Sequence, residues 1–221
     1  MLTLPTHPLA WLAHPDTEAD KSASVFNVEM RCERRCGRGK EIDVAKRKNK
    51  GVSETEPTWH LAGTERELAF AEFQHALICL GEAFYRFIGK TLNHVTQDPN
   101  FTGYDGVILH AIRTADRPKS VTELQEFTNR SDVANIQYSV RKLERAGLIA
   151  KVPRTSGRGT KYQVTKTGRE VVHAYAEYRR ALLDQFPEET ERLVPRLSNA
   201  RDLMVILTGL YDQGSRLMST R

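Results

Sequence analysis

The chain has 221 residues, 39% of them hydrophobic, and a formal net charge of +5 at pH 7, a size that suits one globular domain with or without an appendage. No apolar run approaches the roughly 18 residues that span a bilayer, and the N-terminus lacks the basic and apolar segments of a secretory signal, so we expect a cytoplasmic protein without a membrane partner. Three cysteines, Cys32, Cys36 and Cys79, argue against a disulfide framework.

The distribution of charge says more than its sum. Residues 31–50 hold nine basic and three acidic side chains, and residues 130–161 hold eight basic and two acidic ones. The remainder of the chain is therefore acidic overall. Two basic zones on an acidic body are typical of a protein that binds a polyanion.

Residues 1–60 show no sustained periodicity and contain four prolines, which predicts a basic, largely disordered N-terminal arm. Contact of the arm with DNA phosphates is the alternative to a solvated tail, and its role is left open. Cys32 and Cys36 lie in the arm without the two further ligands that zinc requires. Whether they or Cys79 sense redox state is also open.

Residues 61–99 carry the pattern of one long helix. Thr64 and Glu67 form a capping-box sequence at its start. A wide apolar stripe follows at helical spacing, too wide for a single neighbouring element to cover. Its members are Leu68, Phe73, Leu77, Leu80, Phe84, Phe87 and Leu92.

Residues 100–166 contain three further helix signals. Thr102 opens a helix with Asp105 in its first turn, and the Arg117–Lys119 break at Pro118 ends it. A short helix follows in SVTELQEF, with Val121, Leu124 and Phe127 expected inward. Ser131 is expected to cap the next helix, whose inward face is Val133, Ile136, Val140 and Leu143, and Gly147 to end it.

Two short strands and two long helices complete the chain. The strands are expected at 148–152 and 161–164, joined by the basic tip RTSGRG. Thr167 is expected to cap a long helix, and Pro187 to begin another in which Pro195 introduces a break or is tolerated. Residues 167–221 thus form a C-terminal pair of helices.

The order of these elements predicts a winged helix-turn-helix. The outward residues of the second helix are then candidates for base contact: Asn135 and Gln137 suit adenine, Arg141 suits guanine or a phosphate, and Tyr138 suits a thymine methyl group or a phosphate oxygen. Ser131 and Lys142 are expected on the DNA backbone, and the hairpin cations Arg154, Arg158 and Lys161 on phosphates or in the minor groove. An ordinary solvated helix face and an ordinary turn are the alternatives.

Residues 64–186 resemble the MarR (multiple antibiotic resistance regulator) family of bacterial and archaeal repressors. The resemblance rests on the phrases VTELQEF, SDVANIQYSVRKLERAGLIAKV and GTKYQVTKTGREVV. In that family a phrase like KLERAGL, here 142–148, closes the recognition helix, and a "T..G" phrase, here at 165–168, begins the next one. The wing PRTSGRGTK lacks the acidic residue that many members carry, and the basic arm is not a family feature.

The resemblance implies a homodimer whose first and last helices interlock, so that residues 61–99 and 167–221 become dimerisation segments. It also implies a palindromic operator. Many members respond to a small aromatic acid, and Phe84, Tyr85, His110 and Tyr175 would suit such an effector, but these aromatic positions are equally those of a packed core. No effector site is assigned, and the effector's existence and identity are open.

The sequence therefore predicts a mainly α protein with a small β-hairpin wing, flanked by long N- and C-terminal helices. The predicted function is a sequence-specific double-stranded DNA-binding transcriptional regulator, as a dimeric repressor. A nonspecific or architectural nucleic-acid binder is the alternative. The sequence holds no glycine-rich phosphate loop, metal-spaced His/Cys cluster or Gly-x-Ser-x-Gly elbow, so we expect no catalytic, cofactor or metal site. The sequence does not identify the operator or the regulated genes, and it does not distinguish a repressor from an activator.

Overall fold

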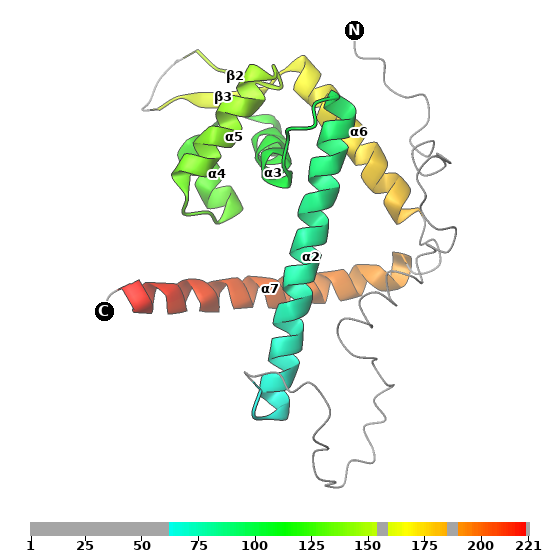
Figure 1. The fold of residues 1–221 in the computed structure, drawn as a ribbon, viewed down its shortest axis with the longest axis vertical. Coiled ribbons are helices and arrows are strands. Elements are labelled where there is room, and N and C mark those ends of the chain that lie inside the picture. The colour runs from blue at the N-terminus through cyan, green and yellow to red at the C-terminus, as the bar shows by residue number, and fades with distance from the viewer. Residues whose placement is uncertain (1–61, 154–158, 185–189, 220–221) are drawn as a thin grey trace.

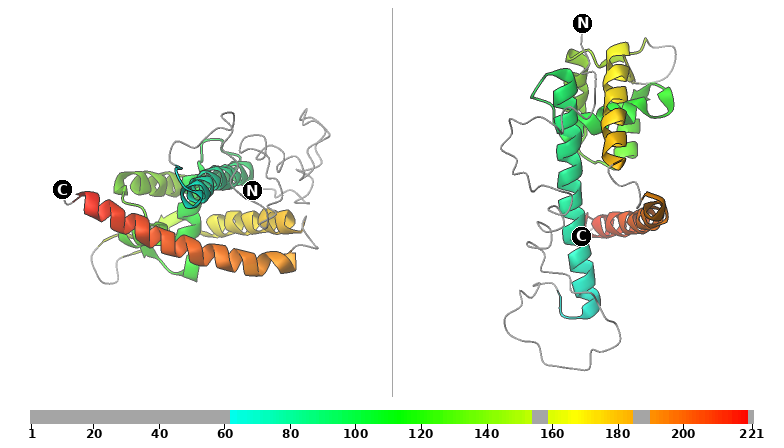
Figure 2. Two further views of the ribbon diagram at one scale, coloured as in Figure 1. Left: turned by 90° about the horizontal axis from the view of Figure 1, so that it is seen from below. Right: turned by 90° about the vertical axis from the view of Figure 1, so that its right-hand side faces the viewer.

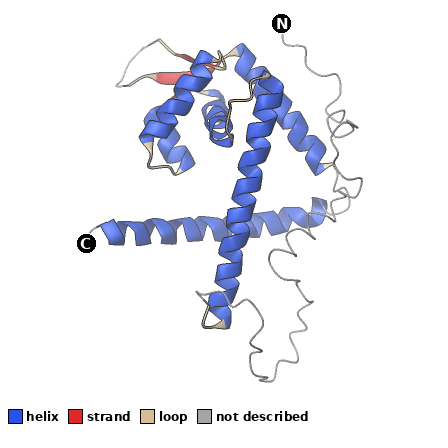
Figure 3. Ribbon diagram, in the orientation of Figure 1, coloured by secondary structure: helices blue, strands red, loops and turns tan. Residues whose placement is uncertain are grey.

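The computed structural model describes residues 62–153, 159–184 and 190–219. These residues form mostly helices, with one small antiparallel sheet at the edge of the helix-turn-helix (Figures 1 and 3). The predicted N-terminal arm, Arg154 and Arg158 in the hairpin tip, and Pro187 all lie outside the described residues. Among the described helices, none combines the length and apolarity that a bilayer crossing requires.

Helix α2, Glu65–Thr96, begins at the predicted cap: the Thr64 hydroxyl accepts a hydrogen bond from the Glu67 N–H at 3.2 Å. The Glu67 carboxylate accepts from the Gly63 N–H at 2.9 Å. Most of the buried residues of α2 lie in its C-terminal part, around Ile88 and Leu92, and Ala71 is buried in its N-terminal half. Its N-terminal half extends away from the helix-turn-helix and the sheet, toward the crossing with the C-terminal helix (Figure 1).

Helix α3, Gly103–Arg113, crosses α2 at a close backbone approach. A Cβ on Gly103 would lie only 2.2 Å from the Tyr85 carbonyl oxygen, so this position requires glycine. The predicted Thr102–Asp105 capping box is confirmed, with the Asp105 carboxylate accepting from the Thr102 N–H at 2.8 Å. The short 3₁₀ turn η1, Thr114–Asp116, follows α3.

Helix α4, Val121–Thr128, is the short helix predicted from SVTELQEF. Its Ser120–Glu123 capping box, together with Arg117, stabilises the charged carboxylate. Hydrogen bonds from the Ser120 N–H and from Arg117 lower the pKa of Glu123 to about 2. Leu124 is fully buried as predicted, but Phe127 is 54% exposed, so its inward assignment is wrong. Phe127 lies in the last turn of this eight-residue helix, whereas Leu124 lies at its middle.

Helix α5, Val133–Arg145, has Asp132 rather than Ser131 as its N-terminal flanking residue. The Ser131 carbonyl accepts from the Val133 N–H, and no side chain caps this end. The C-terminal end follows the prediction: Gly147 has φ +70°, and the Leu148 N–H donates to the Leu143 carbonyl at 3.0 Å. This pattern is a Schellman motif, which turns the chain directly into the first strand of the hairpin.

The core lies between α3, α4, α5 and the sheet. Its largest fully buried side chains come from all of these elements: Ile108, Leu109, Ile112, Leu124, Ile136, Val140, Leu143 and Ile149. Val133, expected in the same inward face, is 38% exposed. This cluster holds the helix-turn-helix together and fixes which side of α5 remains outside.

The sheet has three strands in the order β1-β3-β2. The two predicted strands are β2, Ile149–Lys151, and β3, Lys161–Val164, paired antiparallel with Ile149 opposite Val164. The third, β1, Lys119–Ser120, was not predicted; it pairs with β3 through Lys119 and Tyr162. Lys119 is buried, and its ammonium donates to the Ile112 carbonyl at 3.2 Å and to the Thr114 carbonyl, which closes the C-terminal end of α3.

Helix α6, Lys166–Leu183, has its N-terminal cap two residues before the predicted one. Thr165, not Thr167, accepts from the Gly168 N–H at 3.0 Å, and its hydroxyl also donates to the Gly147 carbonyl at 2.7 Å. A Cβ on Gly168 would lie 2.0 Å from the Leu148 carbonyl oxygen. The end of α5, the wing and the start of α6 therefore meet at one tightly packed corner.

Helix α7, Thr190–Ser219, crosses α2 (Figures 1 and 2) and continues through Pro195 without interruption. Gln74 donates to the Tyr211 hydroxyl at 2.6 Å, and Asn129 lies 3.4 Å from Asp212. Large apolar side chains on α7 are exposed: Val194, Leu197, Leu203, Val205, Ile206, Leu210, Leu217 and Met218. The described chain thus leaves most of the apolar surface of α7 uncovered.

Candidate nucleic-acid interface

Helix α5 has two chemically distinct faces. Ile136, Val140 and Leu143 are at most 1% exposed and face the core. The predicted base-contact residues lie on the remaining surface, where Asn135, Gln137, Tyr138 and Arg141 are all exposed. Tyr138 is 57% exposed, which is high for an aromatic side chain. A packed inner face and an outer face rich in amides are what a helix needs to enter a major groove.

The N-terminal end of α5 carries a local polar network. Arg130 donates to Asp132 at 2.6 Å. Hydrogen bonds from Arg130 and then from Asn135 lower the pKa of Asp132 below its usual value. Asn135 therefore has an intramolecular partner, and its base contact stays a prediction. Ser131 is exposed beside this network, and its expected contact with the DNA backbone is likewise untested.

Lys142 is held by contacts within the protein, and its expected contact with the DNA backbone stays a prediction. Its side chain is only 18% exposed, and its ammonium lies 2.7 Å from the Asp105 carboxylate and 2.5 Å from the Asn100 carbonyl. The three donors of the ammonium are thus directed largely into the protein. Among the sequence-predicted site residues of α5, Lys142 faces inward while its neighbour Arg141 faces solvent.

The described part of the wing contributes Lys161, which is exposed on β3 opposite Ser120. A second wing cation, Lys151 on β2, was absent from the predicted site. It is exposed and lies 3.2 Å from Glu144 of α5. The sequence signal that could have indicated Lys151 is its place in the strand expected at 148–152. In the structure it pairs with Tyr162 of β3. The hairpin begins where α5 ends (Figure 1); whether the tip arginines share the exposed side of α5 stays a prediction.

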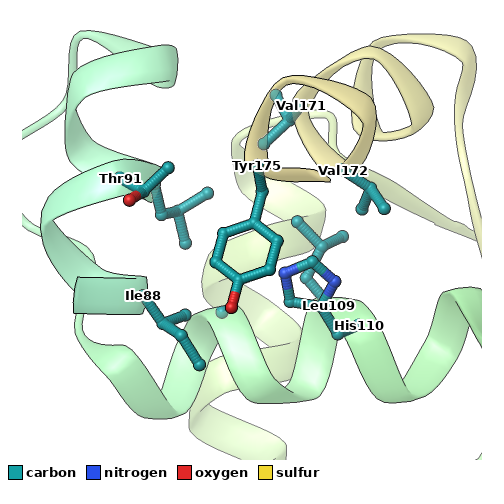
Figure 4. A pocket seen from close by; sticks show the side chains of 9 residues that line it. Ile88, Thr91, Leu109, His110, Val171, Val172 and Tyr175 are labelled. Carbon is teal, nitrogen blue, oxygen red and sulfur yellow. The ribbon is translucent and has the colours of Figure 1, made fainter. Parts of the chain in front are cut away.

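The four aromatic residues suggested for an effector do not gather at one cavity. His110 and Tyr175 pack with their rings 4.3 Å apart in a small pocket between α2, α3 and α6 (Figure 4). The pocket holds about 10 Å³, room for about one water molecule. Tyr85 instead stacks near Tyr104 of α3 at 4.4 Å, and Phe84 is 49% exposed.

Burial in this pocket lowers the pKa of His110, and the positive charge of Arg179 lowers it further. A second hollow of about 70 Å³ lies between α2 and α6, lined by Phe87, Lys90, Thr91, His94 and Tyr178. Both spaces are small compared with typical ligand pockets.

No metal centre is visible among the described residues, since no three His, Cys, Asp or Glu side chains there cluster at coordination distance. Cys79 is a free thiol whose sulfur lies 3.6 Å from the His75 ring nitrogen Nε2. Cys32 and Cys36 lie outside the described residues. Redox sensing by any of the three cysteines therefore stays an open alternative.

Comparison with known proteins places these elements in a recognised architecture. Residues 101–168 match the family model of a winged helix DNA-binding domain. No curated protein matches the chain. Among solved structures, the MarR family transcription regulator SP03579 is 18% identical with a TM-score of 0.51, covering 69% of this chain and 95% of its own. FabT from Streptococcus pneumoniae, solved in complex with DNA, is 14% identical with a TM-score of 0.50, covering 64% and 99%. RV1404 from Mycobacterium tuberculosis is 21% identical with a TM-score of 0.49, covering 64% and 97%.

Identities this low concern the fold, and the fold agrees with the expectation on each point: a mainly helical chain, a small antiparallel wing, and long helices on either side of the helix-turn-helix. The predicted fold class is confirmed. The chain is a winged helix-turn-helix protein with the fold of the MarR-family transcription regulators.

Proposed function

We propose that this protein is a sequence-specific double-stranded DNA-binding transcriptional regulator that acts as a dimeric repressor on a palindromic operator. One observation carries the proposal: in a winged helix-turn-helix, α5 has a fully buried apolar face and an exposed face with Asn135, Gln137, Tyr138 and Arg141. Amide and guanidinium groups on that face can form paired hydrogen bonds with base edges. The proposal involves no catalysis, and we place the protein in the cytoplasm, where such a regulator meets DNA.

The proposed homodimer is supported by the uncovered apolar surface of the two long helices. On α2, the side chains of Leu77, Ile78, Leu80 and Phe84 are 38–65% exposed, and α7 adds its own exposed apolar residues. So many exposed large apolar side chains on two long helices indicate an interaction site. A second copy with two-fold symmetry would cover both helices and set two α5 helices about one turn of DNA apart.

The dimer is tested by sedimentation of the intact protein and an α7 variant. Ile206, 62% exposed on α7, is replaced by Asp, which would place a charge in an apolar interface. We expect a dimer for the wild type and a monomer for Ile206→Asp. A monomeric wild type, or a variant that dimerises as tightly, would refute the interface.

Sequence recognition is tested by selecting sites from random duplexes and then measuring binding to the selected site and to a scrambled one. We expect Asn135→Ala and Gln137→Ala to reduce the ratio of the two affinities, by about 1–3 kcal/mol for each lost paired contact. We expect Arg158→Ala to weaken both duplexes equally and to reduce the salt dependence of binding. Equal losses on both duplexes for every variant would contradict a base-reading α5.

The alternative, nonspecific binding, is favoured by the basic run at 31–50 with its nine basic and three acidic residues. Such a run binds phosphates without regard to sequence and gives a steep salt dependence. Deletion of residues 1–60 separates the two functions. A regulator keeps its ratio of affinities after the deletion, whereas an arm-driven binder loses most of its affinity and has no ratio to keep.

We retain a small-molecule effector of unknown identity as part of the proposal. The side chains around the small hollow between α2 and α6, rather than its volume, support it: Phe87 and Tyr178 are on its walls and Lys90 is at its side. Aromatic carboxylates are the probes of choice, because rings suit the walls and an anion suits the lysine. A rise in melting temperature with such a probe, absent in Lys90→Met, would support the effector; no rise with any of them would count against it.

A further inference from the structure

Lys142 and Asp105 form the most buried ion pair among the described residues. The Asp105 side chain is 2% exposed and that of Lys142 18%, with 2.7 Å between the ammonium nitrogen and carboxylate oxygen Oδ2. The other described ion pairs are more exposed. Burial of two charges costs several kcal/mol per ion unless their geometry and hydrogen bonding are good. A pair in this position calls for a reason other than stability.

The hydrogen bonding around Asp105 is nearly complete. Its Oδ2 accepts from the Thr102 N–H at 2.8 Å and from the Thr102 hydroxyl at 2.9 Å, in addition to Lys142. Burial by itself would raise the pKa of Asp105, but bonds from Lys142, Thr102 and Ser139 outweigh it and leave the pKa below its usual value. The carboxylate is therefore a charged, fixed acceptor at the start of α3.

The ammonium of Lys142 is equally constrained. It also donates to the Asn100 carbonyl at 2.5 Å and lies 5.2 Å from the centre of the buried Phe101 ring. Both Lys142 and Ser139 belong to α5, so α5 contributes two successive turns to the same carboxylate. These directional contacts add to the apolar packing of Ile136 and Leu143, which is itself non-directional.

We propose that Lys142 is a positioning residue: its ion pair with Asp105 fixes the rotation of α5 about its own axis and thereby determines which side chains of α5 reach the base edges. The inference rests on the proposed function, since it concerns how the DNA-reading face is aimed. It also replaces the role that the sequence suggested for Lys142, a direct phosphate contact.

A small rotation of α5 about its axis displaces the tips of its side chains by a large distance compared with the tolerance of a hydrogen bond. Side chains on a helix reach about 5–6 Å from its axis, so a rotation of about 20° moves their tips by roughly 2 Å. Hydrogen bonds tolerate variations of only about 0.5 Å. Loss of the Asp105–Lys142 bond would therefore misplace Asn135 and Gln137 relative to base edges, while contacts with the phosphate backbone, which are less directional, would persist.

The experiment compares Lys142→Gln with Arg141→Gln, its exposed neighbour on the same helix. Affinity for the selected and the scrambled duplex is measured at several salt concentrations with the full-length protein. For Arg141→Gln we expect the slope of log K against log salt to fall by about one, as for a lost phosphate contact. For Lys142→Gln we expect an unchanged slope and a ratio of affinities reduced about tenfold or more.

Asp105→Asn provides the second arm, because it removes no group from the DNA-facing surface. The positioning role predicts the same loss of ratio as in Lys142→Gln. A phosphate contact by Lys142 predicts the opposite, since release from Asp105 would free the ammonium and steepen the slope. Circular dichroism at the assay temperature establishes that each variant is folded.

Should Lys142→Gln or Asp105→Asn fail to fold, Lys142→Arg carries the test. It keeps the charge, and hence the salt slope, but its longer, planar guanidinium cannot take the place of the ammonium between the Asp105 carboxylate and the Asn100 carbonyl, so only the positioning role predicts a reduced ratio. A reduced slope in Lys142→Gln, or a wild-type ratio in Lys142→Arg, overturns the inference while leaving the proposed function standing. A wild-type protein that binds both duplexes equally overturns the proposed function, and the positioning role with it.

Discussion

Leu143 and Gln137 allow the two faces of α5 to be tested separately. Leu143 is fully buried in the core, and Gln137 is exposed on the outer face. Leu143→Ala removes three carbon atoms, worth about 2.4 kcal/mol at about 0.8 kcal/mol per buried methylene. Incomplete collapse of the site adds about 1 kcal/mol for a residual cavity of roughly 50 Å³. We therefore expect the free energy of unfolding to fall by about 3–4 kcal/mol.

Gln137→Ala is the matched control, because a substitution on an exposed surface changes stability by less than about 0.5 kcal/mol. Its effect should be confined to the ratio of affinities for selected and scrambled DNA. Both variants are compared with the wild type by urea denaturation at one protein concentration, since the stability of a dimer depends on concentration. A loss of more than about 1 kcal/mol in Gln137→Ala, or of less than that in Leu143→Ala, would show that the faces of α5 are wrongly assigned.

Three further predictions concern stability. Glu123→Gln weakens the α4 capping box and should cost about 1 kcal/mol at pH 7; because the pKa of Glu123 is lowered to about 2, the difference from wild type in urea midpoint should be full above pH 4.5 and vanish as the pH falls toward 2. Gly168→Ala places a Cβ 2.0 Å from the Leu148 carbonyl oxygen and should cost about 3 kcal/mol, seen as a melting temperature lower by roughly 10 °C; an unchanged melting temperature would refute the close packing. The pKa of His110 is lowered by burial, so the unfolded state takes up its proton first, and stability should fall as the pH drops below about 6.5; His110→Asn should flatten this dependence between pH 7 and pH 5, and an identical pH profile would contradict it.

Helices were predictable where an apolar period and a local cap agreed. Thr64 and Thr102 cap the helices that follow them, and Gly147 ends α5 in the predicted left-handed conformation. All of these signals lie within four residues of the backbone groups that they satisfy. The position of such a helix end is determined by a short stretch of sequence, and it can therefore be predicted from the sequence.

Errors arose where a distant part of the chain made the choice. The phrase Thr165-Lys-Thr-Gly168 offers two hydroxyls for one cap, and Thr165 is used because it also donates to the Gly147 carbonyl, 18 residues away. Strand β1 has two residues, too few to show a period, and exists because β3 lies beside it. The sequence signal at the neighbouring Pro118 indicates only the end of a helix and not the start of a strand.

The candidate site shows the same division between local and distant information at the level of single side chains. Arg141 and Lys142 are adjacent cations on one helix, and residue type alone gives them the same DNA-binding role. The periodicity of α5 separates the two residues only in part, because both lie between the buried Val140 and Leu143. Lys142 lies closer to the buried face of the helix than Arg141 does, as their exposure shows. The residue that pairs with Lys142, Asp105, lies 37 residues earlier, and its sequence signal is that of a helix-cap residue. If Lys142 has the proposed positioning role, a count of basic residues over 130–161 overestimates the charge available to DNA, and the salt slopes of the Arg141 and Lys142 variants measure by how much.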